Sequence, residues 1–144
     1  MPNRPIHKVI QGRPFISLPS ETPASMAAGM MKSMRQDAVI VIESGRIVGL
    51  CTEHDFVIKL IAEGLSPDRT QLSQIMTPRP TTVTADRPLV HALHAMFEGG
   101  FRHLPVVDGD GHPLGMVSAR DALGLEVLET QKELEREEAI REIL

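Results

Sequence analysis

The chain repeats itself, and this repetition limits the fold more than any other feature of the sequence. The segment GLCTEHDF spans residues 49–56, and a related segment, GMVSARDA, spans residues 115–122. The match extends backwards over two more pairs: VIVIESGRIVG (39–49) with LPVVDGDGHPLG (104–115), and ETPASMAAGMM (21–31) with DRPLVHALHAM (86–96). A chain made of two related segments of about sixty residues is expected to bury its apolar faces by packing one unit against the other.

Each copy follows the order β-α-β-β-α. A short extended segment, FISL or TTVT, precedes Pro23 or Pro88, and proline is favoured where a helix begins. An apolar helix, a strand (AVIVI or HLPVV), a turn with glycine and acidic residues, and a second apolar strand come next. The second helix of each copy then begins near Thr52 or Ser118. We therefore predict an α+β fold in which two β-α-β-β-α repeats pack sheet to sheet with pseudo-twofold symmetry, followed by a C-terminal helix.

Changes in composition predict the boundaries of these parts. The segment EGLSPDRTQ has the glycine, proline and polar residues of a linker. The last nineteen residues hold seven glutamates against three basic residues, and their apolar residues do not form a sustained heptad. The predicted parts are a first repeat at 5–63, a linker at 64–71, a second repeat at 72–125 and an acidic helix at 126–144.

Charge and apolar content exclude several classes of partner. The net charge of −4 comes entirely from the acidic tail, so the rest of the chain lacks the basic excess that nucleic-acid binding needs. No apolar run approaches the roughly 18 residues of a membrane span, and the start MPNRPIHKVIQG has no signal-peptide core. The single cysteine, Cys51, fits a reducing compartment. We expect a soluble, cytoplasmic protein that contacts neither membranes nor nucleic acids.

The sequence carries no catalytic motif, and no enzyme activity or catalytic cofactor is expected. Cys51 falls within an apolar strand, where cysteine is usually an inert small hydrophobe. His91 and His94 have the spacing of two metal ligands on a helix, but no nearby cysteine or acid completes the set, so no metal site is expected.

Two interpretations of the repeated motif remain open from the residues alone. A serine or threonine followed three residues later by an acid is typical of a capping box at a helix start. The same arrangement suits a nucleotide, because the hydroxyl can donate to a phosphate and the carboxylate can accept from a ribose diol. Thr52 with Asp55, and Ser118 with Asp121, have this spacing.

The order of an apolar helix, VIVI or LPVVD, and then G-x-x-[ST]-x-x-D resembles that of CBS domains, which occur in tandem pairs called Bateman modules. The resemblance covers residues of about 5–125 and is closest in the second copy, while the first copy is looser around MRQDAVIVIESGR but keeps GLCTEHDF. It implies two clefts between the copies that typically hold AMP, ADP, ATP or S-adenosylmethionine. In such modules the aspartate of the motif takes the ribose hydroxyls.

Carried over by position, the resemblance implies which residues line each cleft. The first cleft would be lined by Thr52, Asp55, Thr77, Thr81, Arg102, His103 and Arg120. The second would be lined by Ser118, Asp121, Gln11, Phe15 and Ile16. Asp37 stands in the second cleft where the first has Arg102, and a carboxylate repels a phosphate. We therefore expect the second cleft to hold a neutral or cationic ligand, or to stay empty.

The resemblance implies a regulatory module that senses an adenosine-containing ligand and passes its occupancy to an effector protein. Modules of this kind commonly dimerise through their helices, so a homodimer is expected. The alternative is a constitutive dimeric interaction or scaffold protein, in which both motifs are only capping boxes and no nucleotide binds.

Overall fold

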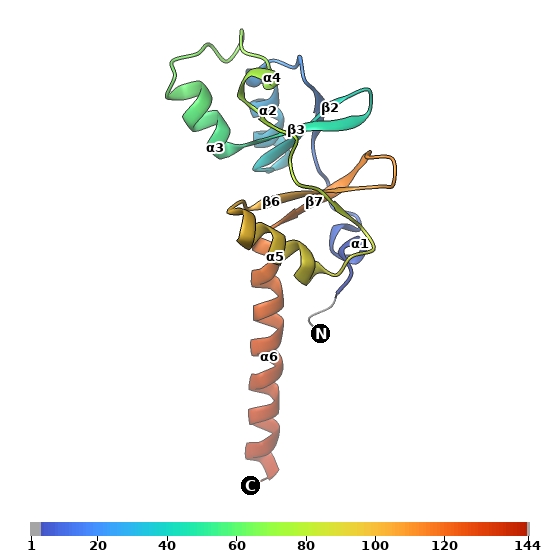
Figure 1. The fold of residues 1–144 in the computed structure, drawn as a ribbon. Helices are drawn as coiled ribbons and strands as arrows, with labels where there is room; N and C mark the ends of the chain where they lie inside the picture. Colours follow the sequence, from blue (N-terminus) through green and yellow to red (C-terminus); the bar gives the residue numbers. More distant parts are fainter. Residues whose placement is uncertain (1–3, 144) are drawn as a thin grey trace.

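The computed structural model describes residues 4–143, apart from the side chains of residues 124–130. Its two repeats lie one beside the other, each with its own β-sheet, and the C-terminal helix extends away from both (Figure 1). Side chains from the two sheets meet between the repeats, where Met116 packs against Ala38, Ile40 and Leu50. Within the described residues, no helix is both long enough and apolar enough to cross a bilayer.

The first repeat forms a four-stranded sheet in the order β1-β2-β3-β4. Its own elements are β1 (Ser17–Pro19), α2 (Ala24–Met34), β2 (Ala38–Glu43), β3 (Arg46–Thr52), α3 (Glu53–Asp55) and the π-helical segment η1 (Phe56–Ile61). The fourth strand, β4 (Thr77–Pro78), comes from the segment that leads into the second repeat. Strand β1 is parallel to β2, and the other neighbours are antiparallel. Strands β2 and β3 contain mainly Val, Ile and Leu, which favour a pleated, buried surface.

The second repeat forms a three-stranded sheet in the order β5-β6-β7. Its elements are β5 (Val83–Thr84), α5 (Leu89–Gly99), β6 (His103–Val107), β7 (Pro113–Ser118) and α6 (Arg120–Ile143). Strand β5 is parallel to β6, and β6 is antiparallel to β7, as in the first repeat. The predicted fold class, with two β-α-β-β-α repeats and a C-terminal helix, is therefore confirmed.

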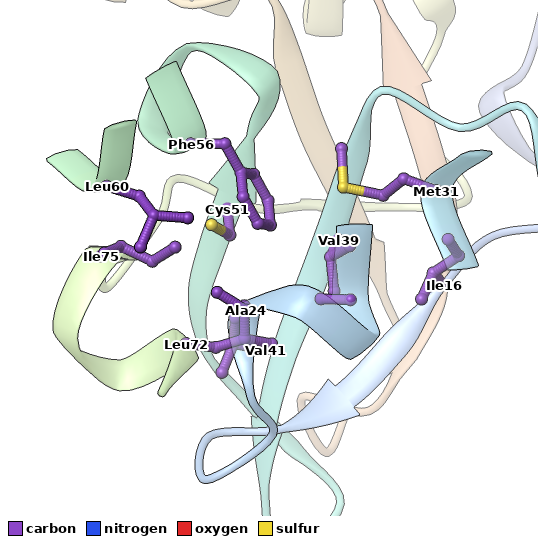
Figure 2. Close-up of a cluster of buried hydrophobic side chains, with 11 residues drawn as sticks. Ile16, Ala24, Met31, Val39, Val41, Cys51, Phe56, Leu60, Leu72 and Ile75 are labelled. Carbon is purple, nitrogen blue, oxygen red and sulfur yellow. The ribbon is translucent and has the colours of Figure 1, made fainter. Parts of the chain in front are cut away.

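Two short helices pack on the repeat that lies further away in the sequence. Helix α1 (Ile6–Ile10) buries Ile6, Val9 and Ile10 in the core of the second repeat. Helix α4 (Leu72–Ile75) buries Leu72 and Ile75 in the core of the first repeat, and Figure 2 shows Ile75 beside Leu60. Each core is thus completed by a helix from the other half of the chain.

The glycine of each motif lies where one of these exchanged segments crosses a sheet. A Cβ atom at Gly49 would overlap the Sδ atom of Met76 and lie 2.9 Å from its Cγ atom. A Cβ atom at Gly115 would lie 3.1 Å from the Cβ atom of Ile10. Met76 and Ile10 stand at the ends of α4 and α1, so both glycines have the same physical cause: the close approach of an exchanged segment.

We predict that Gly49→Ala lowers the free energy of unfolding by about 1–3 kcal/mol, because the added methyl group overpacks the contact with Met76. The control is Gly109→Ala, since a Cβ atom at Gly109 meets no heavy atom within 4 Å. Urea unfolding followed by circular dichroism measures both. Equal stability of Gly49→Ala and the wild type would contradict the contact.

Candidate functional site

The first motif forms a capping box at the start of α3. The Asp55 backbone N–H donates to Thr52 Oγ1 at 3.4 Å, and the Thr52 backbone N–H donates to Asp55 Oδ2 at 3.0 Å. Asp55 is only 4% exposed, although it is a charged residue. A carboxylate at this depth needs partners to offset its lost hydration.

Those further partners come from two other segments of the chain. Thr77 is brought to the motif by strand β4, which pairs Thr77 with Leu50 of β3, and its Oγ1 atom donates to Asp55 Oδ1 at 3.4 Å. The Lys59 ammonium lies 2.9 Å from Asp55 Oδ1 and 3.4 Å from Thr77 Oγ1. The structure thus brings together three of the residues predicted for the first cleft, Thr52, Asp55 and Thr77. Lys59 was not predicted, although its position four residues after Asp55 could have indicated it.

The second motif repeats one of the two capping hydrogen bonds, and its aspartate pairs with a different cation. The Ser118 backbone N–H donates to Asp121 Oδ2 at 2.9 Å. Arg13 binds the same carboxylate with both terminal nitrogens, at 2.6 Å from Nη2 to Oδ1 and 3.2 Å from Nη1 to Oδ2. A bidentate arginine–carboxylate pair is among the stronger polar contacts in proteins. Arg13 was not predicted, because Arg13 and Asp121 are 108 residues apart and no local pattern links them.

The remaining residues predicted for the second cleft lie near Arg13 in the chain but face different surroundings. Gln11 is exposed at the end of α1. Phe15 packs against the cluster of Ala38, Ile40 and Leu50 between the sheets. Ile16 is 2% exposed within the core of the first repeat, so its side chain is not available to a ligand.

Asp37 joins the two repeats through charged groups. Its Oδ1 atom lies 3.0 Å from His103 Nε2, and its Oδ2 atom lies 3.4 Å from Arg120 Nη2. The Asp37 carbonyl accepts a hydrogen bond from the Glu53 backbone N–H at 3.1 Å, which fixes Asp37 beside the start of α3. We expected Asp37 to line one cleft and the two basic residues to line the other; in the structure the three side chains form one cluster, called here the Asp37 cluster.

The His103 ring nitrogen in this cluster is within ion-pair distance of Asp37 but makes no hydrogen bond of acceptable geometry with any described residue. The His103 side chain is 13% exposed. A buried polar atom left in this state is costly and can accept a better partner.

Two predicted residues of the first cleft make no side-chain ion pair or hydrogen bond among the described residues. Thr81 is exposed in the segment between β4 and β5. Arg102 is exposed, and its carbonyl accepts from the Ala119 backbone N–H at 2.9 Å, which mirrors the contact between Asp37 and Glu53. The Arg102 guanidinium is therefore uncommitted.

Neither Cys51 nor the β6–β7 turn offers reactive chemistry. Burial raises the pKa of the Cys51 thiol to about 12, and the Asp55 carboxylate adds to this rise, so the thiol stays protonated and unreactive at neutral pH. Asp108, Asp110 and His112 place ligand-type atoms within 4.8 Å of one another in the turn. The Asp108 carboxylate accepts hydrogen bonds from the backbone N–H groups of Asp110 and His112, at 2.9 and 3.0 Å. These bonds stabilise the turn, which explains why the three side chains lie close together.

We predict that Asp55→Ala lowers the free energy of unfolding by about 1–2 kcal/mol, because it removes the capping box of α3. The comparison variant Lys59→Met keeps the capping box and loses only a pair whose lysine side chain is 40% exposed, which is worth less than about 1 kcal/mol. Denaturant unfolding of both variants gives the two values. If Lys59→Met lowers the free energy of unfolding as much as Asp55→Ala or more, the capping box does not contribute more than the ion pair, and the prediction is wrong.

Comparison with known families gives a match in both repeats. The family model described as CBS domain matches residues 9–62 and 72–127. The CBS domain-containing protein CBSCBSPB3 of Arabidopsis thaliana is 38% identical over 89 residues, which cover 62% of this chain and 16% of that protein. CBSX3, a mitochondrial CBS domain-containing protein of the same organism, is 34% identical over 114 residues, which cover 74% of this chain and 55% of that protein. The chain thus corresponds to only part of the length of these relatives.

Solved structures of CBS domain pairs share the fold. The CBS domain protein PAE2072 from Pyrobaculum aerophilum, complexed with AMP, superimposes with a TM-score of 0.74 and 25% identity, covering 87% of this chain and 98% of that one. The CBS domain pair of protein MJ0100, in complex with 5′-methylthioadenosine and S-adenosyl-L-methionine, superimposes with a TM-score of 0.77 and 24% identity, covering 89% of this chain and 99% of that one.

Proposed function

The chain belongs to the CBS domain family, with two CBS domains side by side, and we propose that it is a non-catalytic regulatory module that binds an adenosine-containing ligand between its repeats. The ligand would be AMP, ADP, ATP or S-adenosylmethionine. An effector protein would respond to its occupancy. No step of this proposal needs a catalytic cofactor.

The observation that carries the proposal is the Asp55 carboxylate, held between hydroxyl groups from the two halves of the chain. Thr52 comes from the first repeat, and Thr77 comes from the segment that leads into the second. A carboxylate accepts hydrogen bonds from both hydroxyls of a ribose, and neighbouring threonine hydroxyls can donate to phosphate or accept from the base. The arrangement has the donors and acceptors that a nucleoside requires.

Binding at this site would exchange one partner for another. Lys59 now neutralises the Asp55 carboxylate, and its side chain is 40% exposed, so it can move into solvent as the ribose hydroxyls take its place. The structures of PAE2072 with AMP and of MJ0100 with 5′-methylthioadenosine and S-adenosyl-L-methionine support a ligand of this class in this fold. A ligand that bridges the repeats stabilises the closed arrangement by mass action.

The second cleft is proposed as the weaker site. Arg13 occupies both oxygens of Asp121, so a ribose there must break a bidentate pair rather than a single contact. Ser118 and Asp121 share with Thr52 and Asp55 the hydrogen bond from the backbone N–H to the carboxylate.

A homodimer is also part of the proposal, because apolar side chains remain exposed on the helices. A groove of about 700 Å³ is lined by residues of α2 and η1, among them Ala28 and Ile61, and also by Asp37, Glu53 and Arg120. Ile61 is 67% exposed, and Phe97 on α5 is 87% exposed. Exposed apolar surface of this kind marks contact with another protein, here a second copy or the effector. We also propose a cytoplasmic location, which a single free cysteine fits.

The test is the melting temperature of the purified protein with adenosine, AMP, ATP, S-adenosylmethionine and NAD. At a concentration one hundred times the dissociation constant, a true ligand adds about 2.7 kcal/mol and raises the melting temperature by roughly 5–10 °C. Asp55→Ala, compared with its own ligand-free melting temperature, should lose this rise. Asp121→Ala is the matched variant for the second cleft and should keep most of it.

The alternative is a constitutive scaffold in which both motifs only cap helices, as the capping bonds of Thr52 and Asp55 allow. Such a protein would show no rise in melting temperature with any of these ligands, and that result would favour the scaffold over the sensor.

A further inference from the structure

We propose that Asp37 sets the charge class of the ligand, so that the module favours adenosine ligands with no phosphate or one phosphate over triphosphates. This inference rests on the proposed function and adds a residue that determines specificity. The carboxylate acts as an internal competitor for the positive groups that a polyphosphate would need.

The geometry of the Asp37 cluster carries the first step. Both carboxylate oxygens are engaged, one by His103 at 3.0 Å and the other by Arg120 at 3.4 Å. Both basic residues belong to the second repeat: His103 begins β6, and Arg120 begins the motif helix α6. Asp37 comes from the first repeat, so the contact is made across the boundary where a ligand must sit.

The position of Asp37 relative to the first motif carries the second step. Its carbonyl binds the Glu53 backbone N–H, and the next residue, Ala38, pairs with Thr52 across β2 and β3. Asp37 therefore stands directly beside Thr52 and Asp55. An anionic group attached to a ribose at Asp55 would therefore meet the Asp37 carboxylate together with the two basic residues that it contacts, His103 and Arg120.

Charge explains the resulting preference. Phosphate oxygens bind arginine and protonated histidine through charge-assisted hydrogen bonds, and the Asp37 carboxylate lies within ion-pair distance of both groups and competes for them. Glu53, whose backbone N–H binds the Asp37 carbonyl, adds a second acidic residue to the lining of the same groove. Arg102 is held beside the second motif by its carbonyl and makes no ion pair with any described residue, so its exposed guanidinium is available to one phosphate, and each further negative charge meets repulsion.

The His103 ring nitrogen shows that the internal pairing is incomplete. It is buried and lies within ion-pair distance of Asp37, yet it makes no hydrogen bond with a described residue. Removing the Asp37 charge would free this nitrogen and the Arg120 guanidinium for a ligand anion.

The experiment measures dissociation constants by calorimetry for adenosine, AMP and ATP with the wild type and with Asp37→Asn. The substitution keeps the shape of the side chain and removes its charge. We expect it to tighten ATP binding at least tenfold and to change adenosine binding less than twofold. The double variant Asp37→Asn/Arg120→Met should lose most of the gain, because Arg120 is the donor that the substitution frees.

The matched control is Asp110→Asn, the same chemical change in the β6–β7 turn, at the end of β6 opposite to His103. It should leave the ratio of ATP to adenosine affinity unchanged. If Asp37→Asn does not fold, Asp37→Ser serves as the second variant with the same expected result. An unchanged ratio in the Asp37 variants would overturn the inference while leaving the proposed function intact.

Inorganic tripolyphosphate separates the two claims further, because it tests charge without a nucleoside. Asp37→Asn should bind it at least tenfold more tightly than the wild type does. Equal affinity would overturn the inference. Absence of binding of adenosine, AMP, ADP, ATP and S-adenosylmethionine in every variant would instead overturn the proposed function.

Discussion

The exchange of two short helices between the repeats is the contact on which the rest of the structure depends. Helix α1 completes the core of the second repeat, and α4 completes the core of the first. The residues that follow these helices are thereby delivered to the two motifs: Thr77 follows α4 and reaches Asp55, and Arg13 follows α1 and reaches Asp121. One packing arrangement thus creates both candidate sites and explains why each motif needs its glycine.

The two sites share a backbone and differ in charge. Asp55 is balanced by Lys59 from its own repeat, whereas Asp121 is balanced by Arg13 from the distant end of the chain. Asp37 of the first repeat adds a further difference between the repeats, because its carboxylate contacts His103 and Arg120 of the second repeat. Every one of these carboxylates is paired within the protein, so a ligand must compete with an internal partner. Ligand affinity and selectivity then depend on how much more strongly each carboxylate binds the ligand than its internal partner.

The fold could be predicted from the sequence because the repeat and its β-α-β-β-α order follow from local patterns of apolar, proline and glycine residues. The capping contacts of Thr52 with Asp55 are equally local, and the resemblance to CBS domains supplied Thr77. The exchange of α1 and α4 could not be predicted in this way, since a helix of four or five residues fits either core by composition. Arg13 and the partners of Asp37 were missed for the same reason: long side chains choose partners that are distant in the sequence, and only the packed structure shows which charges meet.

Whether the repeats fold as one unit is the most direct test of this account, because cores that each depend on a helix from the other half cannot unfold separately. The chain contains no tryptophan or tyrosine, so a single tryptophan reports on one core alone. Phe56→Trp places the reporter in the first core and Phe101→Trp places it against the second. The account predicts that urea unfolding followed by fluorescence coincides, in each variant, with the loss of helical circular dichroism, in one transition. A fluorescence transition that precedes or follows the loss of helix in either variant would show that the repeats are independent and would contradict it.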